Sequence, residues 1–149
     1  MSYRQLTAAE HLDRAEHHRQ VGEALATAAS HEWAAVPYFY AAYHLVKNAL
    51  LVDPVFAEPE RLVEIHPSLH PDHRFTSMHQ ARKSPGPVRD FGVNDLVLQL
   101  YRPTAGTYDR LHKASCAVRY DNGLAIPLER IVLAYESVRD AHASSQLVA

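Results

Sequence analysis

The sequence predicts an all-α protein in which residues 1–149 form one domain, a four- to five-helix up-and-down bundle. Apolar residues recur at spacings of three and four along most of the chain, as helices require. No segment shows the two-residue alternation of a half-buried strand, and clusters of turn-forming residues separate the helical segments. With 149 residues, 47% of them hydrophobic, the chain can bury one core without help from disulfides or a structural metal.

The first helix is predicted to begin at Thr7. The Thr7 hydroxyl can cap free backbone amides, while Glu10 reaches back from three residues further on. His11, His17 and His18 lie on different sides of this helix, and we expect all three to face solvent. The apolar stripe consists mainly of small residues, which would allow close packing against a neighbour: Ala8, Leu12, Ala15, Gly22, Leu25 and Ala29.

A second helix is predicted from about His31 to Leu51, after a cap by Ser30. Its apolar residues cover more than one side, so we expect it to be the central helix. The aromatic residues between Trp33 and Tyr43 have helical spacing, and such residues usually belong to the core, although they could instead stack on bases.

The next stretch, from Asp53 to Pro71, contains four prolines and is predicted to be mostly loop. Only a short helical turn from Glu60 to Ile65 is expected within it. Asp72 could then cap a short helix that runs to Arg82, and the turn residues of the segment Lys83 to Pro87 indicate a connector.

A long helix is predicted from about Val93 to Asp121, with Pro103 kinking it or dividing it in two. Gly123 supplies a left-handed stop, and Pro127 is placed to open the last helix, Leu128 to about Ser144. The predicted buried faces of these helices are Leu96, Leu100, Tyr108, Leu111, Ser115 and Val118, and Leu128, Ile131, Val132, Tyr135 and Val138.

The net charge of −2 conceals an uneven distribution. Residues 61–119 hold nine Lys and Arg against five Asp and Glu, whereas the rest of the chain holds six against twelve. The basic middle is compatible with an anionic partner or with ordinary solvated surface charge. The single cysteine, Cys116, cannot form an internal disulfide and is predicted to be a packing residue. With no signal-like segment or long apolar run, we expect a cytoplasmic protein that does not enter a membrane.

Two strings resemble the signatures of the HEPN superfamily, helical domains named for higher eukaryotes and prokaryotes nucleotide-binding. Residues His31 to His44 read HEWAAVPYFYAAYH, which is similar to the tryptophan- and tyrosine-rich second helix of the family. Residues Tyr108 to Asp121 read YDRLHKASCAVRYD, similar to its second signature, a helix finishing in Ser, Arg and Tyr. The resemblance implies a bundle that often forms a homodimer and, in many members, cuts RNA without metal through an Arg-x(4–6)-His motif.

Arg74 and His79 satisfy that spacing and are our predicted catalytic pair. His79 would be the acid or base, and Arg74 would clamp the phosphate with its planar fork. Arg61 with His66, five residues apart, and Arg4 with His11, seven apart, also fit the motif. A five-residue separation arises about once by chance in a chain with this many arginines and histidines. Residues five apart on a helix point about 140° apart, so two copies across a dimer axis would be needed to close on one phosphate.

Further substrate-binding candidates are Arg110 and Arg119, which lie in the second signature, and the pair His44 and Lys47, which lie one turn apart on the aromatic helix. A lysine on an apolar stripe needs a partner or an opening, so the pair either lines a pocket or is a satisfied histidine beside a snorkelling lysine.

No cofactor is predicted, since the glycines form no phosphate-binding loop. No metal is predicted either. The function predicted is a HEPN-like, metal-independent endoribonuclease of a toxin or phage-defence type, with RNA or nucleotide as ligand and an antitoxin protein as a further partner. Two alternatives remain open: a non-catalytic dimerisation, adaptor or nucleotide-binding module, and a small-molecule binder around His44 and Lys47.

Overall fold

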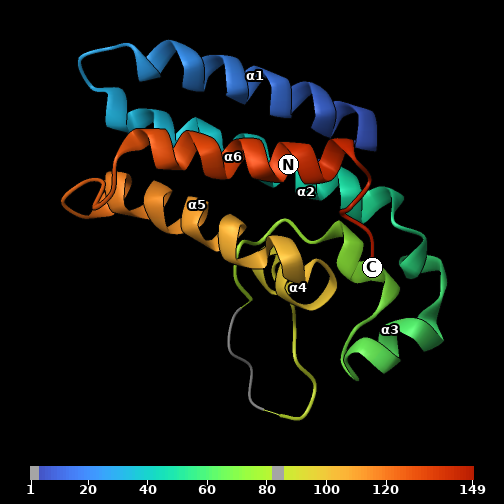
Figure 1. Cartoon of the computed structure of the whole chain (residues 1–149). Helices are drawn as coiled ribbons and strands as arrows, with labels where there is room; N and C mark the ends of the chain where they lie inside the picture. The colour runs from blue at the N-terminus through green and yellow to red at the C-terminus, as the bar shows by residue number, and fades with distance from the viewer. Residues whose placement is uncertain (1–3, 82–85) are drawn as a thin grey trace.

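The computed structural model describes residues 4–81 and 86–149, and all regular structure within them is helical. The all-α prediction is therefore confirmed for the described chain. The long helices are α1 (Ala8–Ala26), α2 (Ala35–Val52), α5 (Arg102–Tyr120) and α6 (Leu128–Ala143), and the short ones are α3 (Pro59–Ile65) and α4 (Val93–Leu100). Figure 1 shows the long helices lying side by side, with α4 below them beside one end of α5 and α3 further out at the lower right.

Helix α1 begins as predicted and buries Ala15 and Gly22 of the predicted stripe, but it buries His11 in place of Leu12. The Thr7 hydroxyl accepts a hydrogen bond from the Glu10 amide at 3.1 Å, while the Glu10 carboxylate binds the Arg4 guanidinium. His11 is buried and Leu12 is 40% exposed, so the expectation that His11 faces solvent is wrong. Close packing against α2 explains the small residues, because a Cβ on Gly22 would lie only 3.0 Å from the Tyr38 ring.

Helix α2 is the central helix, as predicted. A 3₁₀ turn, His31–Ala34, leads into it, and the side chain of Ser30 makes no capping hydrogen bond. The expected cap is therefore wrong. Trp33, on that turn, is 44% exposed and does not belong to the core. The buried residues of α2 lie on nearly all sides of the helix: Ala35, Pro37, Tyr38, Phe39, Ala41, Ala42, Tyr43, Leu45, Val46, Lys47, Asn48, Ala49 and Leu50.

The segment after α2 consists mainly of short helical pieces, beginning with a 3₁₀ turn, Pro54–Ala57, and α3, so the expectation that Asp53 to Pro71 is mostly loop is wrong. The predicted turn near Glu60 exists as α3, but the helix expected from Asp72 to Arg82 does not form. A 3₁₀ turn, Pro71–Phe75, is capped by the His70 ring, which accepts from the Asp72 amide at 3.2 Å. Residues 76–81 then run without regular structure, and the expected connector lies largely outside the described residues.

Tertiary contacts explain why residues 76–81 are not helical. The Tyr43 hydroxyl donates to the Ser77 carbonyl oxygen at 2.9 Å, and the Lys47 ammonium donates to the Thr76 carbonyl oxygen. These carbonyl groups would accept backbone bonds inside a helix. The bonds from α2 hold this segment extended across the middle of the bundle instead.

The second half of the chain follows the prediction closely. Helix α4 ends at Leu100 and α5 begins at Arg102, so the proline at 103 divides the predicted long helix. Gly123 has φ of +95° and its amide donates to the Ala117 carbonyl oxygen at 3.2 Å, which is the left-handed stop expected after α5. The predicted inner faces of α4, α5 and α6 are buried, except that Val132 is half-buried.

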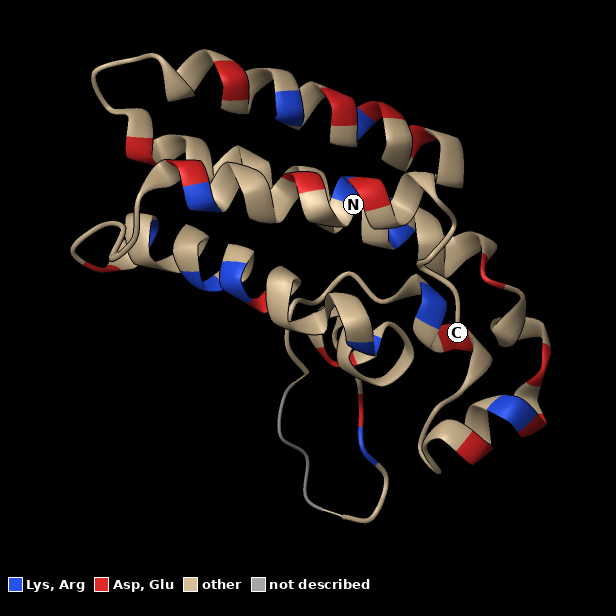
Figure 2. Cartoon of the chain, in the orientation of Figure 1, with Lys and Arg blue, Asp and Glu red and all other residues tan. Residues whose placement is uncertain are grey.

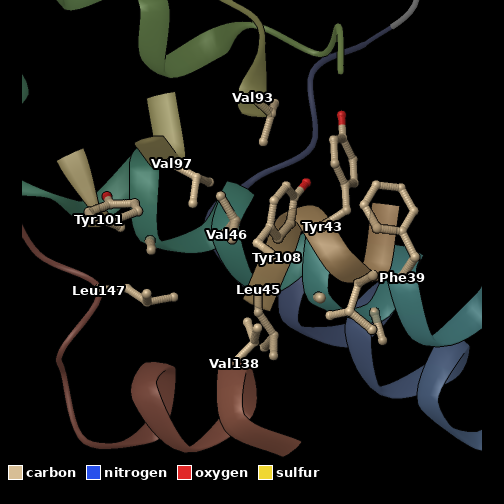
Figure 3. Close-up of a cluster of buried hydrophobic side chains, with 14 of the residues drawn as sticks. Phe39, Tyr43, Leu45, Val46, Val93, Val97, Tyr101, Tyr108, Val138 and Leu147 are labelled. Atoms are coloured by element: carbon tan, nitrogen blue, oxygen red, sulfur yellow. The ribbon is translucent and has the colours of Figure 1, made fainter. Parts of the chain in front are cut away.

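Aromatic rings fill the core between α2 and α5. The centres of the Phe39 and Tyr108 rings lie 5.6 Å apart, and both residues are at most 1% exposed. Figure 3 shows the Tyr43 and Tyr108 hydroxyl groups pointing the same way, away from α6. The polar ends of these rings therefore face the segment that contains residues 76–81. None of the described helices is long and apolar enough to cross a lipid bilayer.

Candidate functional site

A cluster of imidazoles covers the side of α2 that faces away from α6. On α6, Tyr135 packs against Tyr38 with 5.3 Å between ring centres. Two residues along a helix correspond to a rotation of about 200°, so Tyr40 lies on the opposite side, together with His44 one turn later. Figure 1 shows α6 in front of α2, which places this side of α2 behind it in that view. We name the following seven residues the histidine cluster: His11, His18, Tyr40, His44, His79, His112 and Arg119.

The rings of the cluster form a continuous row that crosses three helices and one loop. His79, from the segment after the 3₁₀ turn, lies 5.8 Å from Tyr40 on α2 and 5.7 Å from His112 on α5, measured between ring centres. On the other side, His18 of α1 lies 5.8 Å from Tyr40 and 5.4 Å from His44. Tyr40 therefore separates a His79–His112 side from an α1 side.

His79 is half-buried and carries an unsatisfied polar atom. Its Nδ1 is buried and makes no hydrogen bond to the rest of the described chain. Leaving such an atom unpaired costs about 1–3 kcal/mol, so an unpaired ring nitrogen inside a polar cluster needs an explanation. Burial lowers the pKa of His79, and the charges of His112 and Arg119 lower it further, so the neutral ring is favoured near pH 7. A neutral imidazole can take up a proton.

His112 is oriented from two sides. The Asn94 amide nitrogen lies 3.2 Å from its Nδ1, and the Cys116 sulfur lies 3.7 Å from its Nε2. Burial lowers the pKa of His112, and Arg119 and Lys113 lower it further, although Asp109 acts in the opposite direction. Cys116 was expected to be a packing residue, yet its sulfur touches this ring.

Arg119 offers a guanidinium group with only weak partners. One Nη lies 3.4 Å from the hydroxyls of Tyr40 and Tyr120, the other lies 3.9 Å from the Cys116 sulfur, and Nε donates to the Ser115 carbonyl oxygen at 3.3 Å. None of the ion pairs found among residues 4–81 and 86–149 involves Arg119. A half-buried guanidinium without a carboxylate is suited to an anionic ligand.

The α1 side of the cluster is a packed group of three imidazoles. The Nδ1 atoms of His11 and His44 lie 2.9 Å apart, so one ring donates and the other accepts. The planes of His18 and His44 are nearly parallel, at 6°. Burial is the main cause that lowers the pKa of His11 to about 4 and that of His44 to about 3. The expectation that His18 faces solvent is also wrong, since this ring is half-buried.

Helix α5, which carries His112 and Arg119, has more cationic than acidic residues. Helix α5 carries four Lys and Arg and a single carboxylate, Asp109, and Figure 2 shows this blue series along the helix. Asp109 is already paired with Lys113 at 2.8 Å. The cationic neighbours that depress the imidazole pKa values would equally stabilise a bound anion.

The predicted catalytic pair is only half represented in the cluster. His79 is a member, but the Arg74 guanidinium lies over the Phe75 ring, 4.6 Å from its centre, on the preceding 3₁₀ turn. The Arg74 Nε is buried and makes no hydrogen bond to any described residue. The two residues do not share a helix, so the predicted angle between them does not apply.

The other candidates are distributed over the molecule. Arg61 is exposed on α3 and pairs with Glu64, and His66 accepts a bond from the Ser68 amide and packs against Phe91. Arg110 is exposed on α5, two residues from His112, and therefore points to another side of that helix.

Of the remaining candidates, His44 and Arg119 belong to the cluster. Lys47 is only 2% exposed, and its ammonium group is satisfied by the Thr76 carbonyl oxygen. Desolvation lowers the pKa of Lys47 to about 8. Lys47 therefore has a backbone partner, which is one of the two situations that the sequence left open.

Sequence reasoning missed His112, His18, Tyr40 and Asn94 as site residues. His112, Cys116 and Arg119 recur at spacings of four and three on one side of a helix, which is a usable signal. No local pattern marks the approach of His79 or Asn94, because the fold brings them in from other elements.

The described residues contain no group of three His, Cys, Asp or Glu side chains placed to hold a metal ion. Comparison with known proteins gives no further identification: no family model matches the chain, and no curated protein or solved structure matches it significantly.

Proposed function

We propose that the protein is a HEPN-like RNA-binding protein that cuts RNA without metal, with its site at His79, His112 and Arg119. The observation that carries this proposal is the meeting of two imidazoles and a guanidinium that has no carboxylate partner among the described residues, on one half-buried surface of a single chain. Cleavage through the RNA 2′-hydroxyl needs a base, an acid and positive charge on the transition state, and these three side chains supply those roles.

The proposed reaction conserves every proton. His79 takes the proton from the 2′-hydroxyl, the 2′-oxygen forms a bond to phosphorus, and the bond from phosphorus to the 5′-oxygen breaks. Protonated His112 gives its proton to the leaving 5′-oxygen, and Arg119 binds the phosphate oxygens. The products are a 2′,3′-cyclic phosphate and a 5′-hydroxyl end. Hydrolysis of the cyclic phosphate would return the two imidazoles to their starting protonation states.

Electrostatics explains how His112 becomes protonated when substrate binds. In the empty site, burial and neighbouring cations lower the pKa values of both His79 and His112. A phosphodiester brings one negative charge to the same place, which favours the charged form of either ring and raises its pKa. The negative charge of the substrate phosphate therefore offsets the added positive charge of a protonated imidazole. His112 can then hold the proton that it gives to the leaving 5′-oxygen.

The proposed site needs only one copy of the chain. A second copy would be necessary only if Arg74 and His79 had to reach one phosphate from a single helix. His112 and Arg119 lie beside His79 within the same chain. A homodimer and an antitoxin partner remain predictions, separate from the assembly of the site.

The test is cleavage of a labelled single-stranded RNA by purified protein in excess chelator. His79→Ala and His112→Ala should each lower the rate about 10²-fold or more, and Arg119→Ala about 10²-fold. Matched controls are His31→Ala and Arg110→Ala, which remove an exposed imidazole and an exposed guanidinium outside the cluster. A DNA strand of the same sequence should survive, because it lacks the 2′-hydroxyl.

The proposal fails if wild type does not cut RNA under these conditions, or if the cluster variants and the controls cut equally well. A non-catalytic RNA- or nucleotide-binding module is the second candidate, favoured by the lowered pKa of His112, which leaves less of that ring in the protonated form in the empty site. Binding of RNA that requires Arg119, with no cleavage, would identify that case.

A further inference from the structure

The histidine cluster is larger than the proposed reaction requires. Beyond Tyr40 the row of rings continues to His18 and then to His44. The ring centres of Tyr40 and His18 lie 5.8 Å apart, and those of His18 and His44 lie 5.4 Å apart. The Tyr40, His18 and His44 rings are all half-buried, so each is partly open to solvent. The α1 side has no role in the proposed cleavage.

One arginine, Arg14, also lies on the α1 side. Arg14 lies one turn before His18 on the same side of α1, and it is exposed. None of the ion pairs in the described part of the chain involves Arg14. Its charge disfavours protonation of both His18 and His44, and no carboxylate opposes it at either ring. Arg14 therefore places a guanidinium group without a described carboxylate partner beside these two rings.

The order of the groups along the row matches single-stranded RNA. Arg119 and the rings of His79 and His112 form one polar, cationic end, Tyr40 lies in the middle, and Arg14 and His18 form the other end. A single strand presents phosphate, base and phosphate in the same order, and aromatic rings between basic groups are the usual way to hold it. A base in a duplex is stacked and paired and could not reach Tyr40.

We propose that Arg14 and His18 bind the phosphate next to the one held at His79, His112 and Arg119, with the intervening base over Tyr40, which makes the substrate single-stranded RNA. This inference rests on the proposed function, because it assigns a second contact to the same ligand. It also sets the minimum substrate: a fragment with two phosphates should bind more tightly than a mononucleotide.

Binding of a 2′-O-methyl oligouridylate of about eight nucleotides tests the inference, because this strand cannot be cut and falls within the usual site sizes. Fluorescence anisotropy gives Kd over a series of salt concentrations. The logarithm of the binding constant falls linearly with the logarithm of the salt concentration. Each phosphate that a variant no longer neutralises reduces the magnitude of this slope by about 0.7 for a single strand. Arg14→Gln should weaken binding and lower this slope, whereas His18→Gln should weaken binding without lowering it, because the His18 ring is neutral. Neither variant should change the binding of a mononucleotide. His31→Gln, which removes an exposed imidazole outside the cluster, is the control.

The outcomes separate the two proposals. An unchanged salt slope in Arg14→Gln, or a duplex RNA that competes as well as the single strand, would overturn the second phosphate site while leaving the cleavage site intact. Loss of cleavage in His79→Ala together with normal slopes in Arg14→Gln would likewise overturn the second site alone. A wild-type protein that binds no RNA would overturn both. Arg14 is exposed on α1, so its variant is expected to keep the wild-type melting temperature and to report on binding alone.

Discussion

Lowering the pH should destabilise the protein through the buried pair His11 and His44. Their Nδ1 atoms lie 2.9 Å apart and share one hydrogen bond, which requires at least one neutral ring. Burial lowers the pKa of His11 to about 4 and that of His44 to about 3, whereas the unfolded chain should show the ordinary histidine value of about 6.5. Between these values the unfolded state binds more protons, so the free energy of unfolding falls as the pH drops below about 6.5.

The size of the effect follows from linkage. Between about pH 7.5 and pH 5, a ring that stays neutral in the fold while its unfolded form titrates at about 6.5 loses about 2 kcal/mol. The two rings would lose about 4 kcal/mol together, and we reduce this to about 2 kcal/mol because His44 is partly open to water and the two protonations are coupled. For a domain of this size the melting temperature would fall by roughly 4–8 °C.

Urea unfolding at about pH 7.5 and about pH 5 measures this loss. Other half-buried histidines add to the total in wild type, so the informative quantity is the difference between wild type and the double variant His11→Gln/His44→Gln. The pH-dependent loss should be about 2 kcal/mol smaller in the double variant. His17→Gln, on the exposed side of α1, should keep the wild-type loss. Equal losses in wild type and the double variant would show that neither ring is held neutral by the fold.

Two further outcomes concern stability. Desolvation lowers the pKa of Lys47 to about 8, against about 10.4 in the unfolded chain. Raising the pH from about 7 to about 9 should therefore increase the free energy of unfolding of wild type by about 1 kcal/mol and leave that of Lys47→Met unchanged. The same pH dependence of urea unfolding in both proteins would contradict this. Gly123→Ala should lower the free energy of unfolding by about 1–2 kcal/mol, because φ is +95° there and a Cβ would lie 2.6 Å from a Glu32 carboxylate oxygen. Gly106→Ala, with open space around it, should cause no such loss. Equal melting temperatures for the two variants would contradict this prediction.

Helical periodicity predicted the fold best where one face of a helix alone decides burial. The buried set Tyr108, Leu111, Ser115 and Val118 on α5 follows directly from spacing. The same reasoning placed Leu12 in the core of α1, but the structure buries His11 instead. A small-residue stripe does not fix the rotation of a helix to within one residue, and the hydrogen bond to His44 decides it here.

The helix predicted after Asp72 does not form because tertiary contacts hold its backbone in another conformation. Capping and spacing describe only local preference, and local preference is overridden when distant side chains bind the backbone. Tyr43 and Lys47 bind the carbonyl oxygens of residues 77 and 76, and nothing in the segment itself indicates this. The same extended path brings His79 to Tyr43, with 4.9 Å between ring centres. Sequence therefore identified His79 by its motif spacing but assigned it a different partner.

The candidate site could be predicted only in part. Arg119 and His44 stood out from a family-like string and from an unusual polar position on the central helix. His112 shares a helix side with Arg119, which spacing could have revealed, whereas Asn94 and His18 join the cluster through helix packing that no single segment encodes.

The segment that carries His79 is fastened to the start of α4 rather than built into a helix. The Val93 amide donates to the Met78 carbonyl oxygen at 2.7 Å and the Asn94 amide to the His79 carbonyl oxygen at 3.0 Å, and the backbones meet so closely that a Cβ on Gly92 would lie 2.7 Å from that oxygen. The backbone hydrogen bonds between residues 78–79 and 93–94 can break by local unfolding while the four long helices stay intact. Warming should therefore release this contact, and with it the proposed RNA cleavage, reversibly at temperatures where circular dichroism still reports full helicity. A bulkier residue at position 92 should lower the temperature at which this happens.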